Sequence, residues 1–249
     1  MFKFINFNKI RKEYSNIEIF IKSKAPIKLV FLYYFQSTFN QKIKEKYKKK
    51  KNEYLIKTEK LKISTDWFSG KIPFWLWIFD RYSLRNNKNL RALEIGSWEG
   101  FSAHFLLDQL PNAHLTCVDT WYWPGKDEVA NTSTEIVEKN FDFNLKEFGD
   151  RVKKYRGTSI SYYATHPHEQ FDFIYVDGGH HADDVMIDAL NCFQLLKKNG
   201  IIIFDDYHWK DSSDVLENTA AAINSFLRLK TKKYSIERIY SQLIIRKTV

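Results

Sequence analysis

Short apolar runs alternate with longer amphipathic segments from residue 90 to the end of the chain. Three of the apolar runs are almost continuous, which is typical of parallel strands covered by helices on both faces. The predicted strands are 91–97, 114–120, 152–158, 171–177 and 200–206, with a tightly joined strand pair at 234–248. The predicted helices are 100–110, 133–149, 182–200 and 213–230. This alternation predicts a doubly wound, Rossmann-like α/β sheet of seven strands, mostly parallel with an antiparallel final strand.

Positive charge is concentrated in the N-terminal part of the chain. Residues 1–64 hold 17 Lys and Arg against 5 Asp and Glu, whereas the remainder holds 22 against 25. The lysine run at 42–51 predicts either a solvated helix face or contact with an anionic surface such as a membrane, RNA or charged glycan. We therefore divide the chain into a basic, helical N-terminal extension (1–64) and an α/β domain (65–249).

Composition limits the compartment in which the protein works. No run of 18 apolar residues occurs, so a membrane-spanning helix is not expected, and the first residues lack the order of a secretion signal. The two cysteines, Cys117 and Cys192, both lie in apolar segments, as buried thiols do in a reducing compartment. These features predict a cytoplasmic protein and leave its oligomeric state open.

Polar residues follow several of the predicted strands, at the sheet edge where ligands bind in open α/β folds. The run 94–100, Glu-Ile-Gly-Ser-Trp-Glu-Gly, predicts a strand, a glycine turn and a helix start, so that a ligand can approach backbone N–H groups. Its spacing is not the G-x-G-x-x-G of dinucleotide binding. Asp119 ends the next strand, where a carboxylate can accept both hydroxyls of a ribose. Together these features indicate a ligand site at this edge.

The motifs occur in the order found in a known enzyme family. They are LEIGSWEGFSA (93–103), CVDTW (117–121), Phe141 with Asn144, GTS (157–159), DFIYVDGGHH (172–181) and LLKKNGIIIFDDYHW (195–209). This set resembles the class I S-adenosylmethionine-dependent methyltransferases, and within them the metal-dependent O-methyltransferases that modify sugars and antibiotics. The resemblance covers roughly residues 66–248, so the basic extension lies outside it.

The resemblance implies a set of contacts to S-adenosyl-L-methionine. Its methionine end would be held by Glu94, Gly96, Ser97 and Gly100, together with Trp98, which stands where many of these enzymes have glycine. Asp119 would bind the ribose, and Thr120 and Trp121 would lie beside the adenosine, with Gly157, Thr158 and Ser159 on its adenine side. Asp177 would be a further cofactor contact.

Three carboxylates are expected to meet at the ends of the fourth and fifth strands. Asp177, Asp205 and Asp206 would repel one another unless a cation offset their charge, and oxygen ligands suit Mg²⁺ or Mn²⁺. The resemblance places metal ligands at these same strand ends. The alternative assigns Asp177 to the cofactor pocket and leaves Asp205 and Asp206 solvated or capping a helix.

His180 follows Asp177 after two glycines, and the resemblance implies that it is the general base beside Asp177. We interpret His181, nearer the helix start, as structural. The leading hypothesis is transfer of a methyl group to a hydroxyl of a sugar, glycan or other small polyol. A second hypothesis is a nucleic-acid-binding protein or RNA methyltransferase that uses the lysine-rich arm.

Overall fold

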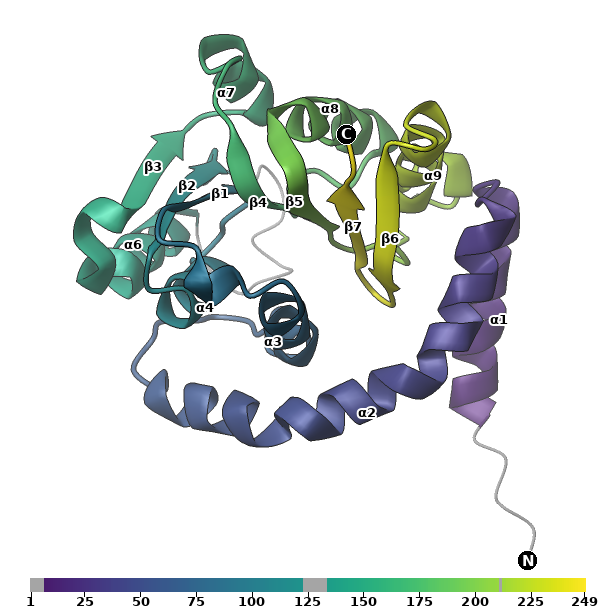
Figure 1. The fold of residues 1–249 in the computed structure, drawn as a ribbon, viewed down its shortest axis with the longest axis horizontal. Helices are drawn as coiled ribbons and strands as arrows, with labels where there is room; N and C mark the ends of the chain where they lie inside the picture. Colours follow the sequence, from purple (N-terminus) through teal and green to yellow (C-terminus); the bar gives the residue numbers. More distant parts are fainter. Residues whose placement is uncertain (1–6, 123–133, 211) are drawn as a thin grey trace, which may run out of the picture.

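Seven strands form one mixed sheet at the centre of the molecule, in the order β3-β2-β1-β4-β5-β7-β6 (Figure 1). The computed structural model describes residues 7–122, 134–210 and 212–249. The strands are β1 (Leu90–Ile95), β2 (Ala113–Asp119), β3 (Val152–Arg156), β4 (Phe171–Val176), β5 (Leu196–Phe204), β6 (Tyr234–Ile239) and β7 (Leu243–Lys247). Strands β1 to β5 are parallel, and β7 is antiparallel to both β5 and β6. The predicted sheet and its antiparallel final strand are confirmed.

Helices cover both faces of the sheet. One layer contains α3 (Ile72–Arg81), α4 (Phe101–Gln109) and α6 (Thr134–Leu145), and the other contains α7 (Ser159–Thr165), α8 (Ala182–Leu195) and α9 (Thr219–Leu229). Neighbouring residues of β5 divide between the two cores, with Ile203 in the first and Ile202 and Phe204 in the second. Because a strand residue points to the face opposite its neighbour, this two-sided burial requires continuous apolar runs.

Several predicted helix bounds differ from the structure. The predicted helix 182–200 ends at Leu195, and β5 begins at Leu196, whose extended backbone (φ −77°, ψ 128°) pairs with Phe171. Lys197 therefore lies in a strand, where its ammonium contacts Asp172 at 2.9 Å, and does not cap a helix. The predicted helix 133–149 continues from α6 into a 3₁₀ turn at Lys146–Arg151, and its position 133 lies outside the described residues.

Two helices form the described part of the N-terminal extension: α1 (Phe7–Lys22) and α2 (Ile27–Lys57). Residues 7–22 and 27–57 are helical as predicted, residues 23–26 connect the two helices, and residues 1–6 lie outside the described range. Figure 1 shows α2 running along the outside of the sheet from β6 towards α3. Among the described helices, none has both the length and the apolar character needed to cross a bilayer.

The extension packs against the α/β domain through buried contacts. Gln36 of α2 donates to the Glu237 carbonyl at 3.2 Å and accepts from the Ile239 N–H at 2.9 Å, so it covers the exposed edge of β6. Tyr54 bonds His104 on α4 at 2.9 Å. A boundary at residue 64 stays a prediction, and these contacts argue against an extension that is independent of the sheet.

Candidate functional site

A glycine turn connects β1 to α4 and brings the end of β1 against the end of β4. Gly96 has a φ of 83°, and a Cβ on it would lie 1.9 Å from the Asp177 carbonyl oxygen. Gly100, with a φ of 77°, is the residue that precedes α4. A side chain at position 96 would therefore separate the two strand ends that carry the predicted site.

Asp119, at the end of β2, is held by the backbone of two loops. Its Oδ2 accepts the N–H groups of Ser97 and Trp98 at 2.8 Å, and its Oδ1 accepts that of Trp121 at 2.7 Å. Burial raises the pKa of Asp119, and these N–H groups oppose that effect. These bonds fix the orientation of the carboxylate beside the glycine turn, and its contact with a ribose stays a prediction.

Glu94 is the other carboxyl group of this region, and it is almost completely buried. Its Oε1 accepts the Ser102 hydroxyl at 2.6 Å, and its Oε2 lies 3.8 Å from the Cys117 sulfur. Burial raises the pKa of Glu94 to about 7, with a smaller contribution from the charge of Asp119. No lysine or arginine offsets Glu94 among its described contacts, so a cationic ligand group would be favoured here.

Two tryptophans close the loops around Asp119. The Trp121 indole N–H donates to the Trp98 carbonyl at 2.9 Å, and its ring packs 4.7 Å from that of Phe141. Thr120 bonds the Tyr122 carbonyl at 3.0 Å. These contacts place Trp98, Thr120 and Trp121 at the edge that carries Asp119, and adenosine contacts remain predictions.

The predicted adenine-side residues have structural partners of their own. The Gly157 N–H donates to the Asp119 carbonyl at 2.9 Å, so this loop lies at the end of β2. Thr158 caps α7 by accepting the Ser161 N–H at 3.2 Å. Burial raises the pKa of Asp188 on α8 to about 6, and a hydrogen bond from Ser159 opposes this rise. Gly157 is thus the member of this trio that the structure brings to Asp119.

Asp177 and Asp205 lie at the ends of β4 and β5 and share one hydroxyl. The Tyr175 phenol bonds Asp177 at 2.7 Å and also bonds Asp205. Burial, together with the negative charge of Asp205, raises the pKa of Asp177 well above its usual range. The predicted meeting of carboxylates at this edge is therefore present.

A lysine that the sequence analysis did not select supplies positive charge here. Lys71, directly before α3, forms an ion pair with Asp205, and the two side chains are 12% and 1% exposed. Burial would lower the pKa of Lys71, but the charges of Asp177, Asp205 and Asp206 outweigh it and raise the pKa. No local motif marks Lys71, because its partners are more than a hundred residues away in the chain.

The carboxylate of Asp205 is surrounded by protein groups that bond to its oxygens. Besides Lys71 and Tyr175, it accepts the Gln242 side-chain N–H at 3.0 Å and the Asp206 backbone N–H at 2.7 Å. Gln242, like Lys71, was missed by the sequence analysis. Asp205 therefore orders the edge of the sheet, and its role as a metal ligand stays a prediction.

Asp206 forms a pair with His180 instead. Its Oδ2 lies 3.3 Å from the His180 Nε2. Burial would raise the pKa of Asp206, but the hydrogen bond with His180 and the charge of Lys71 outweigh it and lower the pKa. Asp177, His180 and Asp206 each offer a ligand atom within 4.8 Å of the others. The structure thus joins His180, and not Asp205, to the other two predicted carboxylates.

The two neighbouring histidines have different surroundings. His181 is exposed at the start of α8 and pairs through its backbone with Asn218, which agrees with its structural interpretation. His180 lies beside Trp209, with 5.7 Å between the ring centroids, and nearly half of Trp209 is exposed. An accessible aromatic ring therefore stands next to the His180–Asp206 pair.

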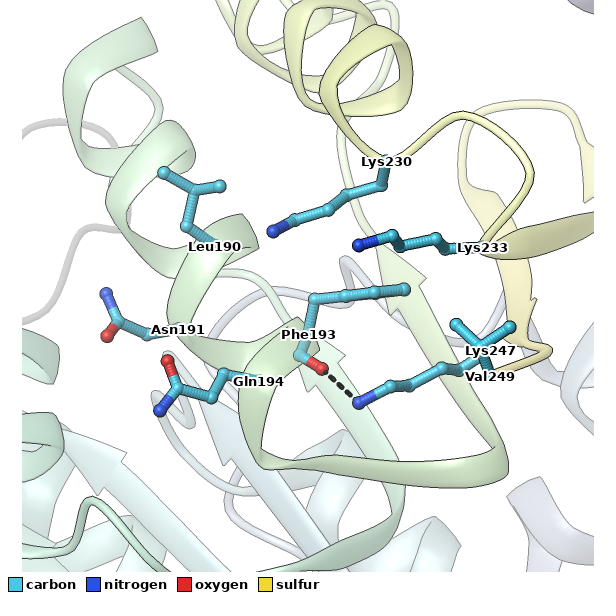
Figure 2. A pocket seen from close by; sticks show the side chains of 8 residues that line it. All are labelled: Leu190, Asn191, Phe193, Gln194, Lys230, Lys233, Lys247 and Val249. Atoms are coloured by element: carbon cyan, nitrogen blue, oxygen red, sulfur yellow. Dashed lines mark hydrogen bonds between the residues drawn. The ribbon is translucent and has the colours of Figure 1, made fainter.

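A hollow of about 390 Å³ lies away from these residues, between α8, the end of α9 and the end of β7 (Figure 2). Its lining residues are Leu190, Asn191, Phe193, Gln194, Lys230, Lys233, Lys247 and Val249. The Lys247 ammonium donates to the Phe193 carbonyl at 2.9 Å. Since β7 is antiparallel to β5, this hollow lies at the sheet edge opposite Asp205.

Comparison with known proteins identifies related sequences and folds. Residues 93–207 match the family model described as a methyltransferase domain. Among curated proteins, no match is found. The fold is similar to that of an O-methyltransferase from Bacillus cereus in complex with S-adenosylhomocysteine, with 16% identity, a TM-score of 0.50 and coverage of 69% of this chain and 79% of that chain.

Two further structures share this fold. A protein described as a caffeoyl-CoA O-methyltransferase from Staphylococcus aureus has 15% identity and a TM-score of 0.53, over 90% of this chain and all of that one. MycE from the mycinamycin pathway, in complex with Mg, S-adenosylhomocysteine and mycinamycin VI, has 15% identity and a TM-score of 0.52, over 74% of this chain and 51% of that one.

Proposed function

We propose that this chain, whose residues 93–207 match a methyltransferase domain, is a class I S-adenosylmethionine-dependent O-methyltransferase that acts on a hydroxyl of a sugar, glycan or other small polyol. The observation that carries the proposal is the His180–Asp206 pair, 3.3 Å apart and next to the exposed Trp209 ring. The pair lies at the sheet edge that also carries the glycine turn, because β4 is the neighbour of β1.

The donor set at the ends of β1 and β2 fits S-adenosylmethionine. Glu94 is a buried carboxyl group suited to the cofactor's ammonium, and the fixed Asp119 carboxylate is suited to its ribose hydroxyls. The turn at 96–100 would hold the methionine part, and Trp121 and Gly157 would lie towards the adenosine. When bound, the cofactor supplies an electrophilic methyl group on its sulfonium.

His180 would act as the general base. An alcohol is a weak nucleophile at neutral pH, so a positioned acceptor for its proton accelerates the reaction. If the His180 Nε2–H donates to Asp206, Nδ1 remains free to accept the proton as the C–O bond forms and the C–S bond breaks. Asp206 would fix the tautomer and stabilise the imidazolium, as a carboxylate does in other histidine pairs.

Asp177 and Asp206 would hold a divalent cation, Mg²⁺ or Mn²⁺. Lys71 offsets one of the three clustered carboxylate charges, so the remaining negative charge fits a cation, and Mg²⁺ is commonly held by one or two carboxylates. The Mg in the MycE complex supports this assignment by analogy. The ion would lower the pKa of an acceptor hydroxyl, while His180 keeps the role of proton acceptor.

A sugar acceptor suits the surroundings of this base. Trp209 offers an accessible aromatic face with a polar edge, and small-molecule sites commonly combine such rings with a few placed polar groups. Asp206 and His180 would then meet the acceptor hydroxyl from one side. The acidic character of the edge disfavours RNA, whose phosphates Asp177 and Asp206 would repel.

The experiment that tests this function is a transfer assay with methyl-labelled S-adenosylmethionine and a panel of sugars, polyols and RNA. We expect base-stable methyl ether formation on a sugar or polyol, loss of turnover in EDTA, and recovery with Mg²⁺ or Mn²⁺. Asp206→Asn should resist this recovery, whereas the exposed control Asp150→Asn should not. Label on RNA alone would contradict the proposal. Full turnover in EDTA would exclude a metal ion from the mechanism but would leave the proposed O-methyltransferase activity unaffected.

A further inference from the structure

Helix α2 has a buried stripe and an outward face with different chemistry. The buried residues recur at intervals of seven or four along the helix: Leu29, Gln36, Ile43, Tyr47 and Tyr54. They pack on β6, α3 and α4. Residues seven apart lie on nearly the same face of an α-helix, so these residues mark the inward side of α2. Val30, Leu32 and Tyr33 also pack against the core, and the side opposite the stripe is directed away from the domain.

The first half of the outward face is apolar. Ile27, Phe31 and Phe35, each four residues apart, are 75%, 70% and 66% exposed, and Tyr34 and Phe39 extend the same surface. Four-residue spacing places side chains on one side of a helix. Large apolar side chains grouped in this way on a surface mark an interaction site, whereas scattered ones do not.

The second half of the same face is basic. Segment 42–51 holds seven lysines and one glutamate. Lys42, Lys46 and Lys49 continue the outward face beyond Phe39, and the Lys42 ammonium lies 5.6 Å from the centre of the Phe39 ring. Apolar and cationic side chains therefore follow one another along one side of a single rigid helix.

We propose that this α2 outer face (Ile27, Phe31, Tyr34, Phe35, Phe39, Lys42, Lys46 and Lys49) docks the protein on an anionic lipid surface. Aromatic and aliphatic side chains of an interfacial helix enter the boundary between headgroups and acyl chains, while its lysines contact lipid phosphates. The inference goes beyond methyl transfer and does not depend on it.

Charge selects this partner over two others. A second copy of the chain packed through this face would either bring the two lysine runs together, where like charges repel, or bury lysines against the apolar half of the other copy, which is also unfavourable. RNA would satisfy Lys42, Lys46 and Lys49, but its phosphates offer no apolar environment for Phe31 and Phe35. An anionic bilayer satisfies both halves of the face at once.

The test is sedimentation of the full-length protein with vesicles. We expect binding to phosphatidylcholine vesicles that contain phosphatidylglycerol, little binding to phosphatidylcholine alone, and weaker binding as salt rises. Phe31→Ser combined with Phe35→Ser should weaken binding by about tenfold or more, because two buried rings are lost. Lys42→Gln, Lys46→Gln and Lys49→Gln together should weaken it by about a hundredfold, at roughly fivefold for each lysine.

Matched controls replace equally exposed residues elsewhere. Ile160→Ser with Leu229→Ser, and Lys88→Gln with Lys198→Gln and Lys232→Gln, should bind vesicles as the wild type does. Unchanged thermal melts establish that each variant is folded. Equal losses in the control and α2 variants would overturn the proposal, as would an absence of vesicle binding. RNA binding without vesicle binding, or dimers lost in the Phe31/Phe35 variant, would also overturn it in favour of those partners.

Discussion

The two halves of the candidate site are built in different ways. The turn half, residues 94–100 with Asp119 and Trp121, is ordered by backbone N–H groups that surround one carboxylate. The acidic half, Asp177, His180, Asp205 and Asp206, is ordered by side chains from distant segments, Lys71 and Gln242. A site region made of backbone contacts is specified by its own short motif, whereas a region made of side-chain contacts depends on the whole fold.

The largest effect is expected at the base of the acidic half. His180→Ala should lower turnover by about 10²- to 10⁴-fold, the usual contribution of a positioned general base. Binding of S-adenosylhomocysteine should change little, because His180 is not part of the turn half. Steady-state rates and calorimetric affinities measure the two quantities separately.

His181→Ala is the matched control for this variant. It removes an exposed histidine next to His180 in the chain, at the start of α8, and should retain most of the turnover. Equal losses in the two variants would show that the 3.3 Å pair with Asp206 does not distinguish the base from its neighbour.

The next largest effect concerns the dependence of the acidic half on Lys71. Lys71→Met leaves Asp205 buried without its cation, and removal of one partner from a buried pair costs about 3–5 kcal/mol of stability. Chemical denaturation of the protein without cofactor gives this free energy of unfolding. Lys57→Met breaks a pair with Asp108 in which the lysine side chain is 65% exposed, and should cost about 1 kcal/mol or less. Similar values for both variants would show that the acidic half does not depend on Lys71 for its order.

Sequence reasoning succeeded where the chemistry is local in the chain. The apolar runs predicted the sheet, because a strand covered on both faces needs apolar residues at successive positions. The glycine in 94–100 predicted the turn, because a positive φ such as that of Gly96 favours glycine. The strand-end rule brought Asp177 and Asp206 together, since parallel strands end at one edge. These parts of the site follow from spacing and topology.

The rest of the candidate site depends on contacts between distant segments, which the spacing of residues in the sequence does not predict. Asp205 and Asp206 are adjacent in sequence, yet Asp205 is surrounded by Lys71, Tyr175 and Gln242 while Asp206 pairs with His180. Asp206 has a φ of 50°, so the strand has already ended and its side chain takes a new direction. Tertiary packing therefore decides which of the two neighbouring carboxylates pairs with His180.

A smaller effect is expected from pH in the turn half. The folded-state pKa of Glu94, raised by burial from 4.5 to about 7, means that its contribution to stability is complete below about pH 4.5 and is lost as pH rises through 7. Glu94→Gln removes this titration, so at pH 8 the variant should be more stable than the wild type, by roughly 3 kcal/mol at most. At pH 4 the two proteins should unfold alike.

The measurement is the difference in unfolding free energy between the wild type and Glu94→Gln, followed from pH 4 to pH 8. Other buried carboxyl groups, such as Asp177 and Asp188, titrate in both proteins and largely cancel in this difference. A difference that does not change with pH would mean that Glu94 is ionised throughout, and that the turn half already supplies it with positive charge.

The smallest of these effects is a loss of cofactor affinity at Asp119. Asp119→Ala should weaken binding of S-adenosylhomocysteine by roughly tenfold or more, because a charge-assisted hydrogen bond contributes about 1.5–3 kcal/mol. The same change frees the N–H groups of Ser97, Trp98 and Trp121, so part of the loss could come from a disordered turn. Asp119→Asn helps to separate the two causes, since its single carbonyl oxygen can still accept the Ser97 and Trp98 N–H groups, while the Trp121 N–H loses its acceptor and the negative charge is gone. If ribose binding needs the charge, calorimetry should show weak binding in both variants, while denaturation should show a larger loss of stability for Ala than for Asn. If Asp119→Asn binds S-adenosylhomocysteine as tightly as the wild type, the charge of Asp119 does not contribute to cofactor binding and the residue only orders the turn.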